Sequence, residues 1–240
     1  MTMNKNKKVK KPVTAAELMK NLLHDPEFVR RQEAKHKSFN ILEEQFARAE
    51  RPLVEALNNA GVSVKSVWDL VNAKESYRLA IPVLIAHLRY PFPYRIREGI
   101  ARALTVKNAG DPAFIALVDE FRKQPDSTDA AQHGFKWALG NAISIVANRN
   151  HFDEIVELIR DRRHGSTREM LILRLADLDG DRAIGVLIQL LADEDVIHEA
   201  LIALGKLKAH KARRHIERLL DHPKFRVRKE AKKALTELDN

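Results

Sequence analysis

A ten-residue pattern that recurs along the chain is the strongest constraint on its fold. The segment RIREGIARAL at 95–104 returns as RVRKEAKKAL at 226–235, and DVIHEALIAL at 195–204 fits the same frame. Two weaker copies lie between them. The copies end at residues 104, 139, 175, 204 and 235, each a leucine, in steps of 35, 36, 29 and 31 residues. A period of about 20–50 residues is typical of stacked repeats, in which each unit buries its apolar face against the next.

Apolar residues within each repeat recur at intervals of three and four, which is the spacing of one helix face. No stretch sustains the alternation of a β-strand. The sequence therefore predicts an all-α fold with about five helix pairs over residues 77–240. The first, or outer, helices are expected at 77–89, 112–122, 151–161, 181–192 and 211–220. The second, or inner, helices are expected at 94–105, 129–147, 166–177, 195–207 and 225–238.

The residues before the repeats follow a different pattern, and we expect residues 13–76 to form an N-terminal helical cap. Thr14 and Glu17 have the spacing of a capping box, which predicts a short helix to about residue 24. A long, weakly amphipathic helix is expected over 27–50. Pro52 should then begin a new helix, because proline is well tolerated in the first turn.

The positive charge of the chain lies at its two ends. Its formal net charge is +9, of which residues 1–12 contribute +5 and residues 205–240 contribute +7, so the remainder carries −3. This distribution argues against a basic nucleic-acid groove along the whole stack and favours a basic terminal patch. Residues 1–12 have no apolar periodicity and are expected to be a disordered basic tail.

Composition limits the cellular compartments and the membrane associations that fit this sequence. The sequence contains no cysteine, which excludes disulfides and thiolate chemistry and agrees with a cytoplasmic protein. No stretch approaches the roughly 20 apolar residues of a membrane span, and no apolar segment of a secretory signal follows the N-terminal lysines. We therefore expect a soluble protein without membrane contact.

The inner-helix pattern Val-Arg-x-x-Ala-x-x-Ala-Leu resembles the HEAT repeat, in particular the short bacterial HEAT-like kind. The resemblance covers roughly residues 77–238. The copy at 227–235 fits best, the copy at 96–104 fits nearly as well, and the unit at 129–147 departs from the pattern with Gln132 in the arginine position. The resemblance implies a right-handed α-α superhelix, an armadillo-type solenoid. Such arrays serve as adaptors, inhibitors, nucleic-acid binders and, in a few families, enzymes, so the fold does not name the function.

Three arginines occupy one position of the repeat, namely Arg97, Arg168 and Arg228. They have two interpretations. A functional ladder would bind anionic groups of a partner on the concave surface. A structural ladder would donate charge-assisted hydrogen bonds to a carboxylate or helix end in the neighbouring unit, as the arginine of HEAT repeats commonly does.

One inner helix carries polar residues that helix propensity does not explain. Lys136 and Asn141 lie in the middle of the helix expected at 129–147, where an amide gains nothing from propensity. Together with Arg97 and Arg168 they form our candidate partner-binding set. Trp137 lies between them and is expected to pack in the core, which is the usual place of such a residue.

Two basic segments are candidate anion-binding sites. The loop that contains Arg162, Arg163 and His164 precedes a helix N-terminus, which favours carboxylate or phosphate groups. The alternative is a solvated loop without a ligand. The second candidate is the C-terminal repeat, with Arg213, Arg214, Arg226, Lys229, Lys232 and Lys233. A terminal repeat also needs a polar outer face for solubility.

No recognisable catalytic or metal-binding motif occurs. The ten histidines lack the spacing of a zinc helix, and the chain has neither a phosphate loop nor a nucleophile elbow. We therefore expect no cofactor, no metal and no enzymatic activity, since the HEAT-like glycosylase or lyase alternative lacks catalytic residues. The sequence favours a scaffold that binds a protein partner on its concave inner-helix surface. The alternative is a nucleic-acid binder that uses the basic terminal repeat and tail, with weak, sequence-independent contacts.

Overall fold

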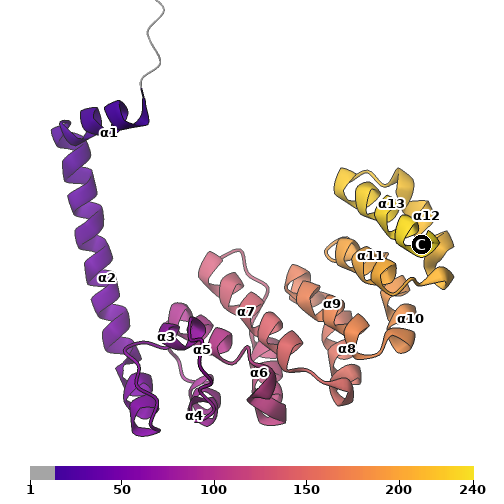
Figure 1. The fold of residues 1–240 in the computed structure, drawn as a ribbon, viewed down its shortest axis with the longest axis horizontal. Helices are drawn as coiled ribbons and strands as arrows, with labels where there is room; N and C mark the ends of the chain where they lie inside the picture. Colours follow the sequence, from indigo (N-terminus) through magenta and orange to yellow (C-terminus); the bar gives the residue numbers. More distant parts are fainter. Residues whose placement is uncertain (1–13) are drawn as a thin grey trace, which may run out of the picture. The chain divides into compact units, whose positions relative to one another are not determined.

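The computed structural model describes residues 14–240, and every regular element in that range is helical (Figure 1). The all-α expectation is therefore confirmed for these residues. The expected tail at 1–12 lies outside the described residues. The boundary between two compact units lies between Arg48 and Ala49, whereas the sequence pattern placed the start of the array at 77.

The described part of the first unit consists of α1 (Ala15–Leu23) and the first two thirds of α2 (Pro26–Asn59). The capping box expected at the start of α1 is present. The Thr14 hydroxyl accepts a hydrogen bond from the Glu17 amide at 3.3 Å, and the Glu17 carboxylate accepts one from the Thr14 amide at 3.1 Å. These bonds satisfy amide groups that have no partner within the helix.

The expectation of a new helix at Pro52 is wrong, because α2 continues through that residue. Proline lacks the amide hydrogen that would bond to the carbonyl four residues earlier, which costs about 3 kcal/mol in a helix interior. Leu53 and Leu57 are fully buried in the next turns. Burial of each leucine stabilises the helix by roughly 1.5–3 kcal/mol, so packing offsets the missing bond.

The second unit holds a short helix, α3 (Trp68–Val71), followed by successive pairs of helices. The outer helices are α4 (Ala80–His87), α6 (Gly110–Lys123), α8 (Phe152–Arg160), α10 (Gly180–Leu190) and α12 (Arg213–Glu217). The inner helices are α5 (Tyr94–Ala103), α7 (Ala130–Val146), α9 (Glu169–Leu178), α11 (Ile197–Lys206) and α13 (Phe225–Asp239). Each inner helix packs against the next, and Figure 1 shows them in one row.

The inner helices share the buried face that the repeat frame predicts. The fully or almost fully buried residues on this face include Ile96, Ile100, Leu104, Leu171, Leu175, Val196, Ala200, Leu204, Val227 and Ala231. Leu235 is only partly buried, whereas Leu238, three residues later, is 2% exposed.

Two segments differ from the expected helices. The chain from Arg162 to Arg168 forms 3₁₀ turns instead of the start of α9, and Gly165 interrupts them with φ 53°. That left-handed conformation favours glycine, and a Cβ here would lie 2.4 Å from the Asp126 carboxylate. The last outer helix is also divided, since 3₁₀ turns flank α12 on both sides.

Candidate functional site

Arg168, expected on a partner-binding surface, is completely buried. Its guanidinium donates to the Ile159 carbonyl at 2.8 Å and to the Asp193 carboxylate at 3.0 Å, while its Nε donates to the Gly165 carbonyl at 2.7 Å. Burial by itself raises the pKa of Asp193, but the hydrogen bond and charge of Arg168 outweigh that effect and lower it below the usual 3.8. The candidate role of Arg168 in partner contact is therefore wrong.

The other two arginines of the ladder also have partners within the protein. Arg97 pairs with the buried Glu120 of the next outer helix, and its guanidinium carbon lies 4.4 Å from the ring centre of Phe135. Arg228 donates to the carbonyls of His222 and Pro223 at 2.7 and 2.8 Å. Arg97 and Arg168 thus fit the structural interpretation, with a carboxylate partner in the neighbouring unit, whereas Arg228 holds the turn of its own repeat.

Lys136 is also buried, with 1% of its surface exposed, so it does not reach a surface partner. Its ammonium nitrogen lies 5.4 Å from the ring centre of Phe121 and has no hydrogen-bond partner in the described chain. Burial lowers the pKa of Lys136, while the charges of Asp126 and Asp161 act in the opposite direction. Of the four candidate partner-binding residues, Lys136 and Arg168 are buried, whereas Arg97 and Asn141 remain partly exposed.

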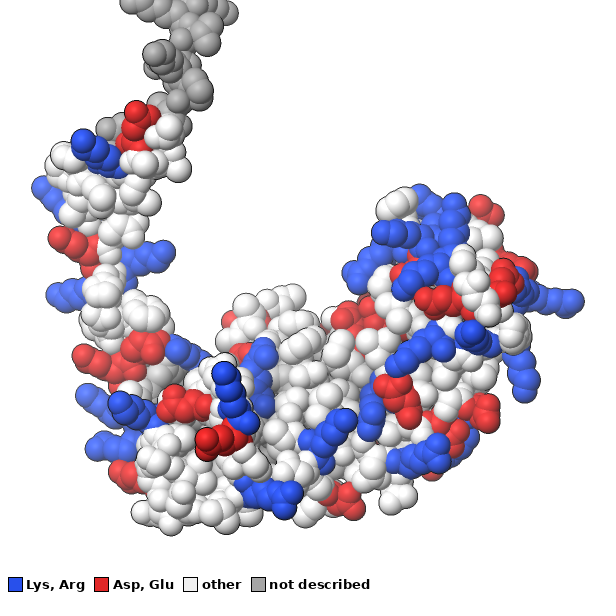
Figure 2. Space-filling view, viewed as in Figure 1, with Lys and Arg blue, Asp and Glu red and all other residues white. Residues whose placement is uncertain are grey.

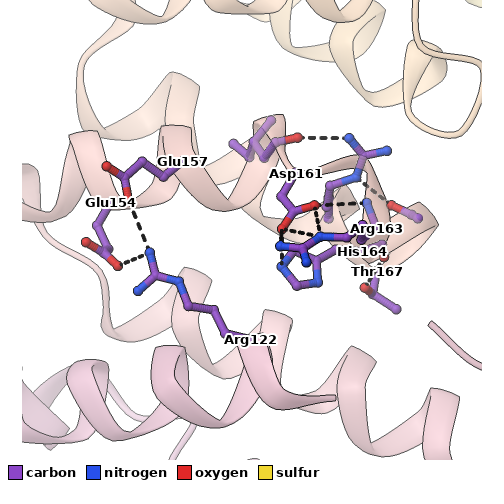
Figure 3. Close-up of polar contacts among 10 residues, drawn as sticks. Arg122, Glu154, Glu157, Asp161, Arg163, His164 and Thr167 are labelled. Atoms are coloured by element: carbon purple, nitrogen blue, oxygen red, sulfur yellow. Dashed lines mark hydrogen bonds and ion pairs between the residues drawn. The ribbon is translucent and has the colours of Figure 1, made fainter. Parts of the chain in front are cut away.

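The two exposed arginines of the loop at 161–168 have acidic partners, and Figure 3 shows the pair of Arg163 with Asp161. Arg163 pairs with Asp161 at 2.7 Å, and Arg162 lies 3.4 Å from the Asp193 carboxylate. His164 is 4% exposed, and burial together with the charge of Lys136 lowers its pKa to about 4. The imidazole is consequently neutral at physiological pH. Neither arginine lacks an acidic partner, so the loop shows no free anion-binding cluster.

The C-terminal repeat gathers lysine and arginine at the end of the chain (Figure 2). Several of these side chains have acidic partners: Arg213 pairs with Asp239, Arg226 lies 3.9 Å from Glu199, and Lys233 lies 3.5 Å from Glu230. No ion pair joins Arg214, Lys229 or Lys232 to another residue within 14–240. The uncompensated charge of this candidate anion site is thus smaller than its composition indicates.

Three neighbouring inner helices present a surface that the sequence interpretation did not identify. It consists of one column of side chains from each helix, and we call it the inner wall. Its residues are His133, Trp137 and Asn141 on α7, Glu169, Leu173 and Asp177 on α9, and His198, Ile202 and Lys206 on α11. Each column has i, i+4, i+8 spacing, so its members lie on one helix face. In α11 the column comprises all residues that are not buried.

Contacts between the helices align these columns into rows. In the first row, Glu169 interacts electrostatically with His133 on one side and His198 on the other. In the third row, the Lys206 ammonium lies 2.6 Å from the Asp177 carboxylate. The spacing within each helix then places Trp137, Leu173 and Ile202 in the row between.

The middle row is apolar and stands apart from the core. Trp137, Leu173 and Ile202 are all partly exposed, and none belongs to the set of apolar residues that pack on the core cluster. The expectation that Trp137 packs in the core is therefore wrong. Its indole instead lies beside α5, with the guanidinium carbon of Arg102 5.6 Å from the ring centre. The first and third rows flank these residues with polar and charged groups.

The repeat frame itself contained the signal for the inner wall. The steps of 36 and 29 residues that separate the terminal leucines of the second, third and fourth copies also separate His133, Glu169 and His198. Aligning the repeats column by column would have placed Trp137 beside Leu173 and Ile202. Without that alignment, residue type alone favours the core for Trp137.

Other classes of site find no support in the described chain. Within residues 14–240, no group of three or more His, Asp or Glu side chains is arranged to hold a metal ion. No helix in the same range combines the length and apolar character of a membrane span.

Comparison with known proteins supports the repeat assignment. Residues 152–236 match the family model of HEAT repeats. No significant match is found among curated proteins. Similar solved structures include an engineered protein (19% identity, 73% of this chain and 53% of that chain, TM-score 0.42) and a designed armadillo repeat protein (17% identity, 81% and 98%, TM-score 0.41). The chain thus spans about half the length of the first of these. The family match thus covers the later helix pairs, and the stacked helix pairs described above agree with a HEAT-like repeat.

Proposed function

We propose that this protein is a non-enzymatic scaffold that binds a protein partner on the inner wall. The observation that carries the proposal is the apolar middle row formed by Trp137, Leu173 and Ile202, which is partly exposed and lies outside the core. Protein interfaces combine an apolar centre with a polar rim, and tryptophan is enriched among the residues that dominate binding energy. The inner wall has both features, because polar rows flank its apolar middle row and that row contains Trp137.

The dimensions of the stack suit an extended ligand. Packed helices lie about 8–10 Å apart, so the three helices of the inner wall span roughly 16–20 Å from the first axis to the third. An α-helix of about 11–13 residues has that length. The side-chain amide of Asn141, which forms no hydrogen bond with another residue within 14–240, offers a donor and an acceptor beside Trp137.

A paired capture experiment tests the proposal. Tagged wild-type protein and the variants Trp137→Ala and Ile202→Ala would be recovered from native cells after crosslinking, with nuclease treatment in parallel. Ile115→Ala is the matched control, because Ile115 is 58% exposed on the outer helix α6. We expect one set of proteins to be captured by the wild type and the control and lost from both wall variants.

The nucleic-acid alternative predicts a different result from the same experiment. If capture depends on nucleic acid, it would disappear after nuclease treatment and in the variant Lys229→Glu, Lys232→Glu, which reverses two exposed charges on α13. Capture that is insensitive to Trp137→Ala and Ile202→Ala, with the variants still folded by circular dichroism, would refute binding at the inner wall.

A further inference from the structure

An acidic side chain without a direct partner borders the middle row of the inner wall. Glu169 is the first residue of α9, and its side chain is partly buried. No ion pair or hydrogen bond joins its carboxylate to another residue within 14–240. Its nearest column neighbour is Leu173, one helical turn further along the same face. A ligand that contacts Leu173 therefore passes close to this carboxylate.

A second acid lies beside the first. Glu199 on α11 is 7% exposed and interacts electrostatically with Glu169. Its own contacts are His198 at 3.1 Å and the more distant guanidinium of Arg226 at 3.9 Å. The charge of Arg226 also acts on Glu169. One basic side chain thus faces two carboxylates, and this edge of the inner wall retains negative charge.

The same surroundings leave the Glu169 carboxylate poorly compensated. Burial, followed by the charge of Glu199, raises the pKa of Glu169 above its ordinary value, and Arg226, His198 and His133 only partly oppose that shift. A cation supplied from outside would improve the electrostatic environment of both carboxylates. A lysine or arginine side chain can do so without displacing any existing ion pair of Glu169.

Resting on the function proposed above, we propose that the partner of the inner wall is a polypeptide segment with arginine or lysine next to large apolar side chains. The apolar side chains would cover Trp137, Leu173 and Ile202, and the basic group would bind Glu169 beside Glu199. Side chains four residues apart on a helix have Cβ atoms about 5–6 Å apart. To match that distance, the basic and apolar side chains of an extended partner are two residues apart, because the rise is about 3.3 Å per residue. In a helical partner they are three or four residues apart.

Selection from a random dodecapeptide library displayed on phage tests this inference with the full-length chain as bait. Enriched peptides would be synthesised, and their affinity measured by fluorescence anisotropy for wild type, Trp137→Ala, Glu169→Gln and Glu169→Lys. Asp181→Lys is the control for charge reversal, because Asp181 is exposed on the outer helix α10. Circular dichroism melts establish that each variant is folded.

We expect the enriched peptides to combine basic and large apolar residues at these spacings. Glu169→Gln should weaken their binding roughly tenfold, as expected for loss of a charged hydrogen bond, and Asp181→Lys should leave it unchanged. Glu169→Lys should abolish binding of the basic peptides and restore it for peptides in which the basic residue is replaced by glutamate. A purely structural role of Glu169 would not produce that exchange of preference.

The outcomes separate this inference from the function on which it rests. Peptides that require Trp137 but lack basic residues, or that bind equally to wild type and Glu169→Gln, would overturn the basic-segment inference and leave the inner wall as a protein-binding surface. A selection that yields no peptide dependent on Trp137 would overturn both.

Discussion

The buried ion pair between Arg168 and Asp193 gives the sharpest test of the fold. Asp193 is 5% exposed and Arg168 is not exposed at all, and their side chains join successive repeats at 3.0 Å. In Asp193→Asn the shape is kept, but the guanidinium loses its charged partner in a site that water does not reach. Two backbone carbonyls and the side-chain amide oxygen of the variant remain as neutral acceptors, and the nearest other acid is Asp195 at 3.7 Å, which is 57% exposed.

Removing one partner of a buried pair leaves an uncompensated charge, which costs about 3–5 kcal/mol. For a protein of this size, each kcal/mol lowers the midpoint by about 2–4 °C, so the expected decrease is roughly 6–20 °C. The matched control is Arg163→Ala. Arg163 pairs with Asp161 at 2.7 Å but is 89% exposed, and an exposed pair contributes about 0–1 kcal/mol.

Thermal and urea denaturation followed by circular dichroism at pH 7 measure the difference. The double variant Arg168→Met, Asp193→Asn should be less damaged than the sum of the single variants, because it leaves no buried charge unpaired. A midpoint for Asp193→Asn within 2 °C of that of Arg163→Ala, where the destabilisation is about 0–1 kcal/mol, would show that the pair is hydrated or dispensable and would refute our assignment.

Three further outcomes follow from individual residues. Leu204→Ala should lower the free energy of unfolding by roughly 2–5 kcal/mol, and Leu235→Ala by less, since Leu204 is fully buried and Leu235 is not; equal losses in urea denaturation would contradict the repeat register. Gly165→Ala should destabilise by about 1–3 kcal/mol because of its backbone conformation, whereas Gly185→Ala, where a Cβ meets nothing within 4 Å, should be neutral or stabilising by up to about 1 kcal/mol; melting curves that rank them in reverse would be incompatible with a left-handed turn at Gly165. Because the pKa of His164 falls from 6.5 to about 4 on folding, its contribution to stability is complete above pH 6.5 and decreases by about 3 kcal/mol as the pH falls to 4; His164→Phe should flatten this part of the pH profile, and an unchanged profile would mean that His164 is solvated.

The sequence predicts most of this fold because its repeats carry both a period and a helical spacing. The expected helix at 151–161 corresponds to α8, Phe152–Arg160, and that at 225–238 to α13, Phe225–Asp239. The wrong predictions concern segments whose helix boundaries depend on tertiary packing or on a turn conformation. Pro52 stays within α2 because the leucines that follow are buried, and the helix expected from 166 begins at 169 because Gly165 adopts a left-handed turn.

The candidate site was less predictable, because residue type does not reveal which helix face a side chain occupies. Lys136 and Trp137 are adjacent, yet the lysine is buried and the tryptophan is partly exposed. Successive residues differ by 100° around a helix, so an error of one position reverses the assignment. The orientation of α7 depends on its contacts with both neighbouring helices, which composition and propensity do not contain. Asn141 is predictable as a surface candidate because an amide in the middle of a helix gains nothing from helix propensity.

The contacts among the repeats join each helix to its immediate neighbours, and this has a mechanical consequence. Tension applied along the row from α5 to α13 would be carried by each interface in series. The interface that separates at the lowest force would therefore open first. In such an arrangement repeats separate one at a time, and single-molecule extension should give a sawtooth of small steps, each releasing about one repeat of chain, in place of a single cooperative rupture.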